Sequence, residues 1–260
     1  MLAQIKLDDA IILVIETSDY LHRLEANQFN LFTQKLHNSL LKTIGRFKGK
    51  IISQNDNAYS VAFISVTDAV LCALKVQSKF KYVTPKFDTS IRKLKIGIAH
   101  GGGNLNAHLL ATRLCELITD QIVITKDIKT LYEKENQNTF IDREHIKVMT
   151  SSEVSFLTNL MNYIETVWND SNFKVDELPK VLGYSRSQVY RKTVALTGKA
   201  PSHFIRDFRL NRALFLLRNK KGNISEIAAQ TGFGSATYFS KCFKERFKIL
   251  PSKYIRQHIH

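Results

Sequence analysis

The chain has 260 residues, enough for two ordinary domains, and 44% of them are hydrophobic, which is usual for a folded soluble protein. Its 38 lysines and arginines against 23 acidic residues give a formal net charge of +15, which predicts a polyanionic partner such as nucleic acid. The longest apolar run, residues 10–15, is too short to span a membrane, the N-terminus lacks a signal-peptide layout, and the three cysteines lack metal-site spacing, so we expect a cytoplasmic protein with reduced thiols, no membrane partner and no cofactor.

The first half of the chain alternates predicted strands and helices. Strands are expected at residues 10–15, 51–53, 59–64, 94–98 and 122–124, and helices at 18–47, 68–81, 109–118 and 126–131. The order β-α-β-β-α-β, followed by α-β, predicts an α+β domain with a ferredoxin-like arrangement. We place this domain in residues 1–135.

Several segments of this region resemble the class III adenylate and guanylate cyclases. They are the strand Ile12–Ser18, the hairpin Gly49–Phe63, the strand Leu94–Gly101 and the helix Ala111–Glu116, within a match that covers about residues 10–132. The resemblance implies a cyclase-type fold. It also implies a homodimer, because these cyclases build their sites across a dimer interface.

The catalytic positions that the resemblance implies are only partly filled. Cyclases hold two metal ions between two aspartates; Asp56 takes the place of the second, and Glu16 replaces the first. Arg113 takes the place of an arginine that steadies phosphate charge, but Leu109 and Ile52 replace the side chains that orient the ribose and recognise adenine. These departures predict an inactive domain that serves dimerisation, the sensing of a nucleotide or other small molecule, or both. Glu16, Asp56 and Arg113 are then vestigial candidates for metal and nucleotide binding. The sequence favours a turn residue at Asp56 and a surface or interface residue at Arg113 over these ligand-binding roles.

The second half of the chain is the more basic one. Residues 1–150 hold 20 lysines and arginines against 15 acidic residues, whereas residues 151–260 hold 18 against 8. The polar stretch that ends the first half reads as a linker at residues 136–150, and everything after it reads as helix. The polyanion should therefore meet an all-α domain at residues 151–260.

A repeat of about fifty residues organises this all-α domain. Val175–Leu178 is echoed by Ile224–Ile227, Gly183-Tyr184 by Gly232-Phe233, Ser185 by Ser235, and Pro201–Arg206 by Pro251–Arg256. Each copy reads as a short helix, a glycine turn, a second helix and then a helix that begins with proline. This layout predicts two helix-turn-helix motifs, each placing its second helix in the major groove of DNA.

Local signals set the predicted helix ends in each motif. Asp176 and Ser225 are expected to cap the first helices, and Ser185 and Ser235 to start the second helices. Gly183 and Gly232 can adopt the positive φ that ends a helix. Pro201 and Pro251 suit a first helical turn.

Residues 156–257 resemble the AraC/XylS family of transcription regulators. The resemblance is carried by Ile224–Gln230, Gly232-Phe233, Tyr238–Ser240, Phe243-Lys244 and Pro251–Tyr254, and in the first copy by Leu178, Gly183–Ser185, Arg191 and Thr197-Gly198. It implies two helix-turn-helix subdomains joined by a long helix, here residues 201–219.

The N-terminal turns of the two recognition helices supply the residues expected to contact double-stranded DNA. They are Arg186, Ser187, Tyr190 and Arg191 in the first motif, and Ala236, Thr237, Ser240 and Lys241 in the second. Arg191 is expected to recognise a guanine, because its guanidinium group can donate hydrogen bonds to both O6 and N7 of that base. The residues expected to hold phosphates are Lys192, Lys244, Arg246 and Lys253.

The sequence thus predicts a DNA-binding transcription regulator that also contacts RNA polymerase. Three alternatives remain at this point. They are a DNA-bound class III cyclase with residual activity, an architectural DNA binder without a sensing role, and an α-helical bundle whose basic face is merely solvated.

Overall fold

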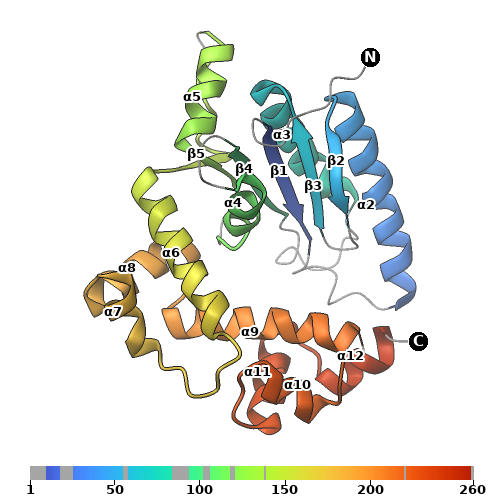
Figure 1. The fold of residues 1–260 in the computed structure, drawn as a ribbon. Helices are drawn as coiled ribbons and strands as arrows, with labels where there is room; N and C mark the ends of the chain where they lie inside the picture. The colour runs from blue at the N-terminus through green and yellow to red at the C-terminus, as the bar shows by residue number, and fades with distance from the viewer. Residues whose placement is uncertain are drawn as a thin grey trace. The chain divides into compact units, whose positions relative to one another are not determined.

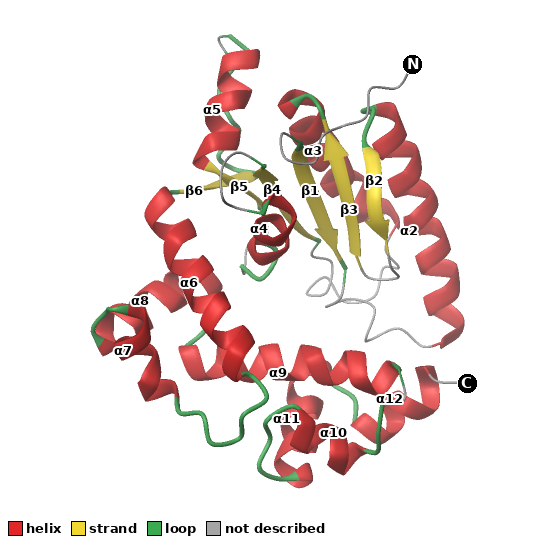
Figure 2. Cartoon of the chain, in the orientation of Figure 1, coloured by secondary structure: helices red, strands yellow, loops and turns green. Residues whose placement is uncertain are grey.

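The structure of the chain, a computed structural model, describes residues 10–17, 26–54, 58–83, 94–101, 106–117, 121–137, 139–219 and 221–258. It divides after Ser155 into an N-terminal unit (residues 1–155) and a C-terminal unit (residues 156–260). The described part of the N-terminal unit contains both strands and helices, and that of the C-terminal unit contains helices without strands (Figure 2). The prediction of an α/β region followed by a helical domain is confirmed.

The N-terminal unit is built on a sheet that has six strands in the described part of the chain. The strands are β1 (Ile11–Glu16), β2 (Lys50–Gln54), β3 (Ala58–Phe63), β4 (Lys95–His100), β5 (Ile122–Thr125) and β6 (Ile146–Met149). Their order is β2-β3-β1-β4-β5-β6. The pairs β2–β3, β3–β1 and β1–β4 are antiparallel, and the pairs β4–β5 and β5–β6 are parallel. In the first four positions, strands that are not consecutive in the chain lie side by side, as in a β-α-β-β-α-β unit whose two helices cross over the sheet.

Helices cover both faces of this sheet. One face carries the main buried cluster, to which α2 (Ala26–Arg46), α3 (Val66–Val83) and α5 (Lys126–Glu135) contribute. The other face carries α4 (Ala107–Leu114), which lies so close to β4 that a Cβ at Gly97 would overlap the carbonyl oxygen of Ala111 (Figure 1). Because β1 is covered on both sides, the run 10–15 is buried throughout and shows no alternation.

The predicted linker at residues 136–150 is wrong, because this stretch lies within the N-terminal unit. β6 lies within it and pairs with β5 in register from Ile122–Ile146 to Thr125–Met149. The preceding turn is closed by Asp142, whose carboxylate accepts hydrogen bonds from the backbone N–H groups of Glu144 and His145. The many polar residues of this stretch favour a linker, but strand pairing buries Ile146 and Met149 regardless of the polar residues between them.

The C-terminal unit is organised around one long helix. The first helix is α6 (Ser151–Val167), and the long central helix is α9 (Pro201–Arg218). Between them lie the 3-10 turn η3 (Val175–Glu177), α7 (Leu178–Leu182) and α8 (Arg186–Thr197), and after α9 come α10 (Ile224–Gln230), α11 (Ala236–Phe247) and α12 (Pro251–His258). α8 contacts α9 from one motif, and α10, α11 and α12 contact it from the other (Figure 1). Both predicted proline starts and the predicted long connecting helix are confirmed.

Candidate nucleic-acid interface

The first motif consists of α7, a glycine turn and α8. Gly183 ends α7 with φ 71°, and Ser185 begins α8. The Ser185 hydroxyl accepts a hydrogen bond from the Gln188 backbone N–H at 3.2 Å, and the Gln188 side chain accepts one from the Ser185 N–H at 2.9 Å. This reciprocal capping box fixes the first turn of α8, from which a recognition helix contacts base edges.

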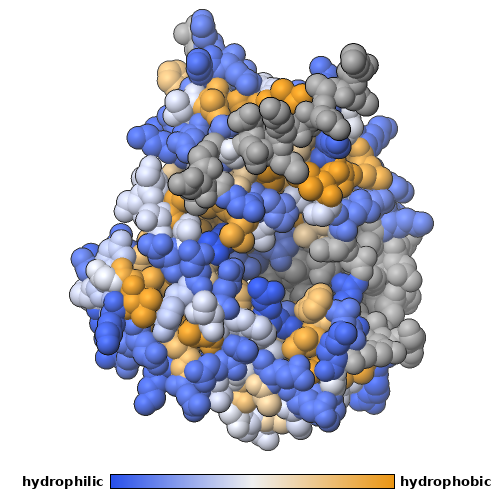
Figure 3. Space-filling model, viewed as in Figure 1, coloured by the Kyte–Doolittle hydropathy of each residue, from blue (hydrophilic) through white to orange (hydrophobic). Residues whose placement is uncertain are grey.

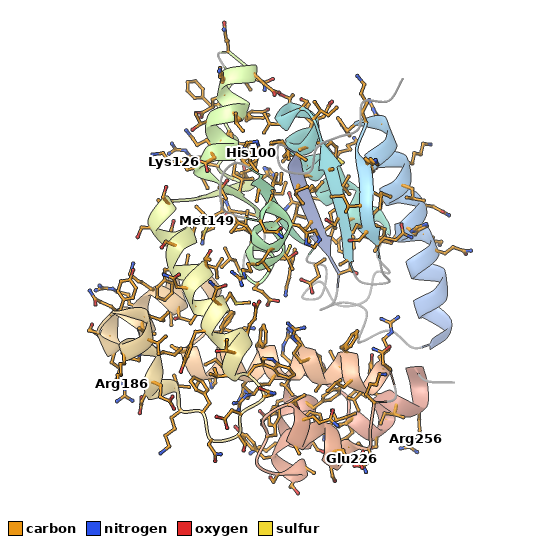
Figure 4. The ribbon with its side chains drawn as sticks, viewed as in Figure 1. His100, Lys126, Met149, Arg186, Glu226 and Arg256 are labelled. Atoms are coloured by element: carbon orange, nitrogen blue, oxygen red, sulfur yellow. The ribbon has the colours of Figure 1, made fainter. Side chains whose placement is uncertain are left out.

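One face of α8 is buried and the other is open. Val189, Thr193 and Leu196 face the interior. The predicted contact residues lie on the open side, all of them exposed: Arg186, Ser187, Tyr190 and Arg191. The Arg186 side chain is 83% exposed, extends outward from the start of the helix, and lies 3.1 Å from the Asp176 carboxylate (Figure 4).

The second motif repeats this geometry with α10 and α11. Gly232 lies in the turn with φ 74°, and the Ser235 hydroxyl caps α11 by accepting a hydrogen bond from the Tyr238 N–H at 3.2 Å. A column of touching aromatic rings fills the interior, with Phe239, Phe243 and Phe247 stacked along α11. The opposite side presents Thr237, Lys241 and Lys244 as exposed residues and Ala236 and Ser240 as half-buried ones.

Two predicted helix caps are wrong. In the second motif Asn223, not Ser225, caps α10, because its side chain accepts from the Glu226 N–H at 3.0 Å and Glu226 accepts from the Asn223 N–H at 2.9 Å. In the first motif the helical turn begins one residue before Asp176, and the Lys174 N–H donates to Glu177 at 3.0 Å. An Asn-x-x-Glu capping pattern was legible in the sequence and would have identified Asn223.

Two of the predicted phosphate-binding residues direct their charge inward. The Lys192 ammonium group lies 5.2 Å from the Tyr184 ring centre and 5.6 Å from that of Phe156. Arg246 is only 20% exposed and lies 3.5 Å from the Asp207 carboxylate. These cations contribute to packing through cation–π and ionic contacts. Lys244 and Lys253 are exposed, and their predicted role stays a prediction.

Sequence reasoning missed the charged residues of α9. Asp207 is 8% exposed and pairs with both Lys199 and Arg246. Arg209 is half-buried, and its burial lowers the pKa of the guanidinium from the ordinary value. The available signal was a pair of opposite charges, Asp207 and Arg209, two residues apart among the phenylalanine and leucine residues of this helix, where charged residues need partners.

Tyr238, on the first turn of α11, has a perturbed hydroxyl. A hydrogen bond with Cys242 and partial burial raise its pKa, and the nearby Arg206 side chain opposes that rise. The hydroxyl therefore stays protonated near neutral pH, and Tyr238 presents no charge to DNA.

The vestigial candidates in the N-terminal unit come from different parts of the chain. Glu16 is half-buried at the end of β1, Arg113 is 3% exposed on α4, and Asp56 lies outside the described residues. Ile52 and Leu109, which replace the expected base and ribose contacts, are each 40% exposed. The expectation that Arg113 is a surface residue is wrong, because its side chain is buried.

Among the described residues, one cluster of side chains has the spacing of metal ligands. Asp142, Glu144 and His145 place their ligand atoms within 4.8 Å of one another, but all three are exposed and Asp142 already accepts hydrogen bonds in its own turn. In the described part of the chain, no helix is both long and apolar enough to cross a membrane.

Comparison with known proteins matches residues 178–257 to the helix-turn-helix domain family. The histidine kinase P4 of Formosa agariphila is 36% identical over 119 residues, which cover 44% of this chain and 9% of that protein. The Msm operon regulatory protein of Streptococcus mutans is 30% identical over 113 residues, covering 44% of this chain and 40% of that protein. The chain therefore spans less than half the length of either relative.

The chain is also similar to solved structures. The transcriptional regulator from Chromobacterium violaceum, described as having an AraC-type DNA-binding domain, is 28% identical, covers 42% of this chain and 97% of its own, and has a TM-score of 0.38. The C-terminal half of the chain carries an AraC-type helix-turn-helix domain, as predicted. The matched family region begins at residue 178 and leaves the N-terminal unit outside it.

Proposed function

We propose that the protein is a sequence-specific, DNA-binding transcription regulator of the AraC type. The observation that carries this proposal is the duplicated pair of serine-capped helices, α8 and α11, each with an apolar inner face and a polar outer face. The net charge of residues 151–260 favours a phosphate-rich partner. A DNA-binding regulator of this kind works in the cytoplasm and acts on RNA polymerase, which we propose as a second partner.

The two recognition helices differ in the chemistry that they offer to bases. α8 presents Arg186 and Arg191, and an arginine fork can bind both acceptors of a guanine. α11 presents small side chains and Lys241 at the corresponding places. We propose that α8 contributes more of the base discrimination and that α11 contributes more through backbone contacts.

We further propose that the N-terminal unit is a cyclase-like domain without catalytic activity. This proposal is supported by the segments that resemble class III cyclases and by Leu109 and Ile52, which cannot make the ribose and adenine contacts of those enzymes. Its role would be to pair two copies of the chain, to bind a small molecule or nucleotide, or to do both.

Selection of genomic DNA fragments by the purified full-length protein tests the proposed function. We expect enrichment of a motif with two conserved boxes about one helical turn apart, because two linked recognition helices enter successive major grooves. Recovery of unenriched fragments, with binding that depends on length alone, would contradict sequence-specific regulation and favour an architectural DNA binder.

A further inference from the structure

One arginine of α9 joins the two helix-turn-helix motifs through backbone oxygens. The Arg209 guanidinium donates hydrogen bonds to the carbonyl groups of Trp168 at 2.7 Å, Asp170 at 2.7 Å and Gly232 at 2.9 Å. Trp168 and Asp170 lie in the segment that follows α6, whereas Gly232 lies in the turn of the second motif, three residues before the cap of α11. Arg209, on the helix between the two motifs, therefore binds the backbone on both sides: the segment before the first motif and the turn of the second motif.

The segment bound by Arg209 belongs structurally to the first motif. Phe156 of α6 packs edge-on against Tyr184, between α7 and α8, with ring centres 5.6 Å apart. Tyr163 of α6 packs on Phe173 at 5.9 Å, and its hydroxyl donates to Glu177 of η3 at 3.5 Å. A displacement of Trp168 relative to Gly232 would therefore displace α8 relative to α11.

The contact at this junction is close as well as polar. A Cβ at Gly232 would stand 2.7 Å from the Trp168 carbonyl oxygen and 3.0 Å from Arg209 Cζ. The turn of the second motif is thus seated directly on the end of α6, with the guanidinium between the carbonyl groups. A planar guanidinium suits this arrangement because its donors point in fixed directions, which a lysine ammonium cannot reproduce.

A second polar link lies on another side of α9. Asp207 is two residues before Arg209, about 200° away around a helix. Its carboxylate pairs with Lys199, which follows α8, and with Arg246 of α11. The second motif is therefore held to α9 by charged contacts from two directions, in addition to its own apolar core of Leu214, Phe239, Phe243 and their neighbours.

From this geometry we infer that Arg209 is a positioning residue that sets the separation of the two recognition helices, and thereby the spacing between the two DNA boxes that the protein accepts. This inference rests on the proposed function. A change of one base pair moves a box by about 3.4 Å and turns it by about 34° around the DNA axis. If the two motifs are held rigidly, DNA with the altered spacing binds more weakly. If the motifs can shift relative to each other, both spacings bind with similar affinity.

The test measures binding of the full-length protein to duplexes that carry the two selected boxes at the preferred spacing and with one base pair added or removed. Arg209→Lys keeps the positive charge but removes the planar guanidinium group that binds the three carbonyl groups. We expect the wild type to bind the preferred spacing at least about tenfold more tightly than the altered ones. The gain in affinity from linking two motifs is lost when the geometry prevents both from binding their boxes at once. In Arg209→Lys this ratio should fall at least threefold, while affinity for a single box remains.

Two further variants separate positioning from general weakening. Arg212→Lys is the matched control, because Arg212 follows Arg209 by three residues on the same helix and its guanidinium lies over the rings of Trp168 and Phe208 instead of binding the three carbonyl groups. Its spacing profile should match the wild type. Asp207→Asn leaves Arg209 in place and should relax spacing in the same direction by a smaller factor, which keeps the inference testable should Arg209→Lys fail to fold.

The outcomes distinguish this inference from the proposed function. Trp168 is the single tryptophan of the chain, so its fluorescence reports directly on whether each variant keeps the junction folded. Spacing profiles of folded Arg209→Lys and Asp207→Asn that equal the wild type would overturn the positioning role alone. A wild-type protein that enriches no sequence would overturn the proposed function, and the positioning role with it.

Discussion

Gly232, in the turn of the second motif, lies against the carbonyl oxygen of Trp168 at the end of α6, at a distance that leaves no room for a side chain. Gly183, at the equivalent place of the first motif, has the same positive φ but open space around it. The two glycines are therefore equivalent in backbone conformation and different in packing. On the face drawn in Figure 3, hydrophobic residues lie in small separate groups among hydrophilic ones.

This difference predicts unequal effects of alanine at the two glycines. Gly183→Ala should reduce the free energy of unfolding by about 1–2 kcal/mol, the cost of a left-handed conformation for a residue with a side chain. Gly232→Ala should cost at least about 1 kcal/mol more, because the new methyl group overlaps the Trp168 carbonyl. Urea unfolding followed by Trp168 fluorescence measures both. Equal losses would mean that the close contact at Gly232 relaxes without cost.

Arg191→Ala and Lys244→Ala should weaken DNA binding in different ways. Loss of a bidentate contact to guanine removes roughly 1–3 kcal/mol of discrimination at one base position. Loss of a phosphate contact weakens all sequences alike. Repeating the selection with each variant checks this, with Lys253→Ala as a second phosphate control. An unchanged motif after Arg191→Ala would show that α8 is placed wrongly on the DNA.

The fragment 151–260 should fold and bind DNA by itself. It keeps the whole of α6 and a core of its own, including Phe156, Leu160, Phe204 and Phe243. Because each neutralised phosphate releases counterions, the logarithm of its affinity should fall steeply and linearly with the logarithm of salt concentration. Titrations between low and physiological salt measure the slope. A flat response would contradict binding through the basic surface.

Full-length protein should be a dimer that binds paired sites more tightly than the fragment does. Linking two DNA-binding domains raises affinity for a paired site by about 10²–10⁴-fold when both can engage. Light scattering at micromolar concentration and titration of single and paired sites test this, with the fragment 151–260 as the unlinked reference. A monomeric full-length protein with no preference for paired sites would rule out coupling through the N-terminal unit.

Native Cys72 and Cys115 should resist alkylation at pH 8. Burial, aided by the nearby Asp68 carboxylate, raises the pKa of the Cys72 thiol to about 12, and burial raises that of Cys115 as well. Since the reactive species is the thiolate, little is present below pH 9 in the folded chain. Mass spectrometry after iodoacetamide treatment should find these thiols labelled only once the protein is unfolded.

The same shift has a consequence for stability at high pH. A thiol whose pKa is higher in the folded chain contributes stability that is complete below its unfolded value of 9.0 and declines as the pH rises toward 12. Thermal unfolding of the N-terminal unit should therefore move to lower temperature above pH 9. Cys72→Ser or Cys72→Ala would blunt that pH dependence, and an unaltered dependence would contradict this assignment.

The sequence by itself determined the features that depend on local chain chemistry. The two glycine turns, Ser185 and Ser235 as caps and the proline starts of α9 and α12 were all predicted, because each follows from backbone conformation over a few residues. Repetition of these signals fifty residues apart also identified the DNA-binding motifs. The predicted contact residues of α8 lie on its open face for the same reason.

Only the tertiary structure decided which charges face DNA and how the two motifs are joined. Lys192 and Arg246 look like phosphate contacts in the sequence, yet aromatic rings and Asp207 from other elements hold them. β6 was hidden in a polar stretch because its partner, β5, lies more than twenty residues earlier. Arg209 binds carbonyl groups 41, 39 and 23 residues away along the chain, and no local pattern encodes such contacts. Burial of a charge becomes favourable only where distant segments supply its partners, and that supply is a property of the folded chain.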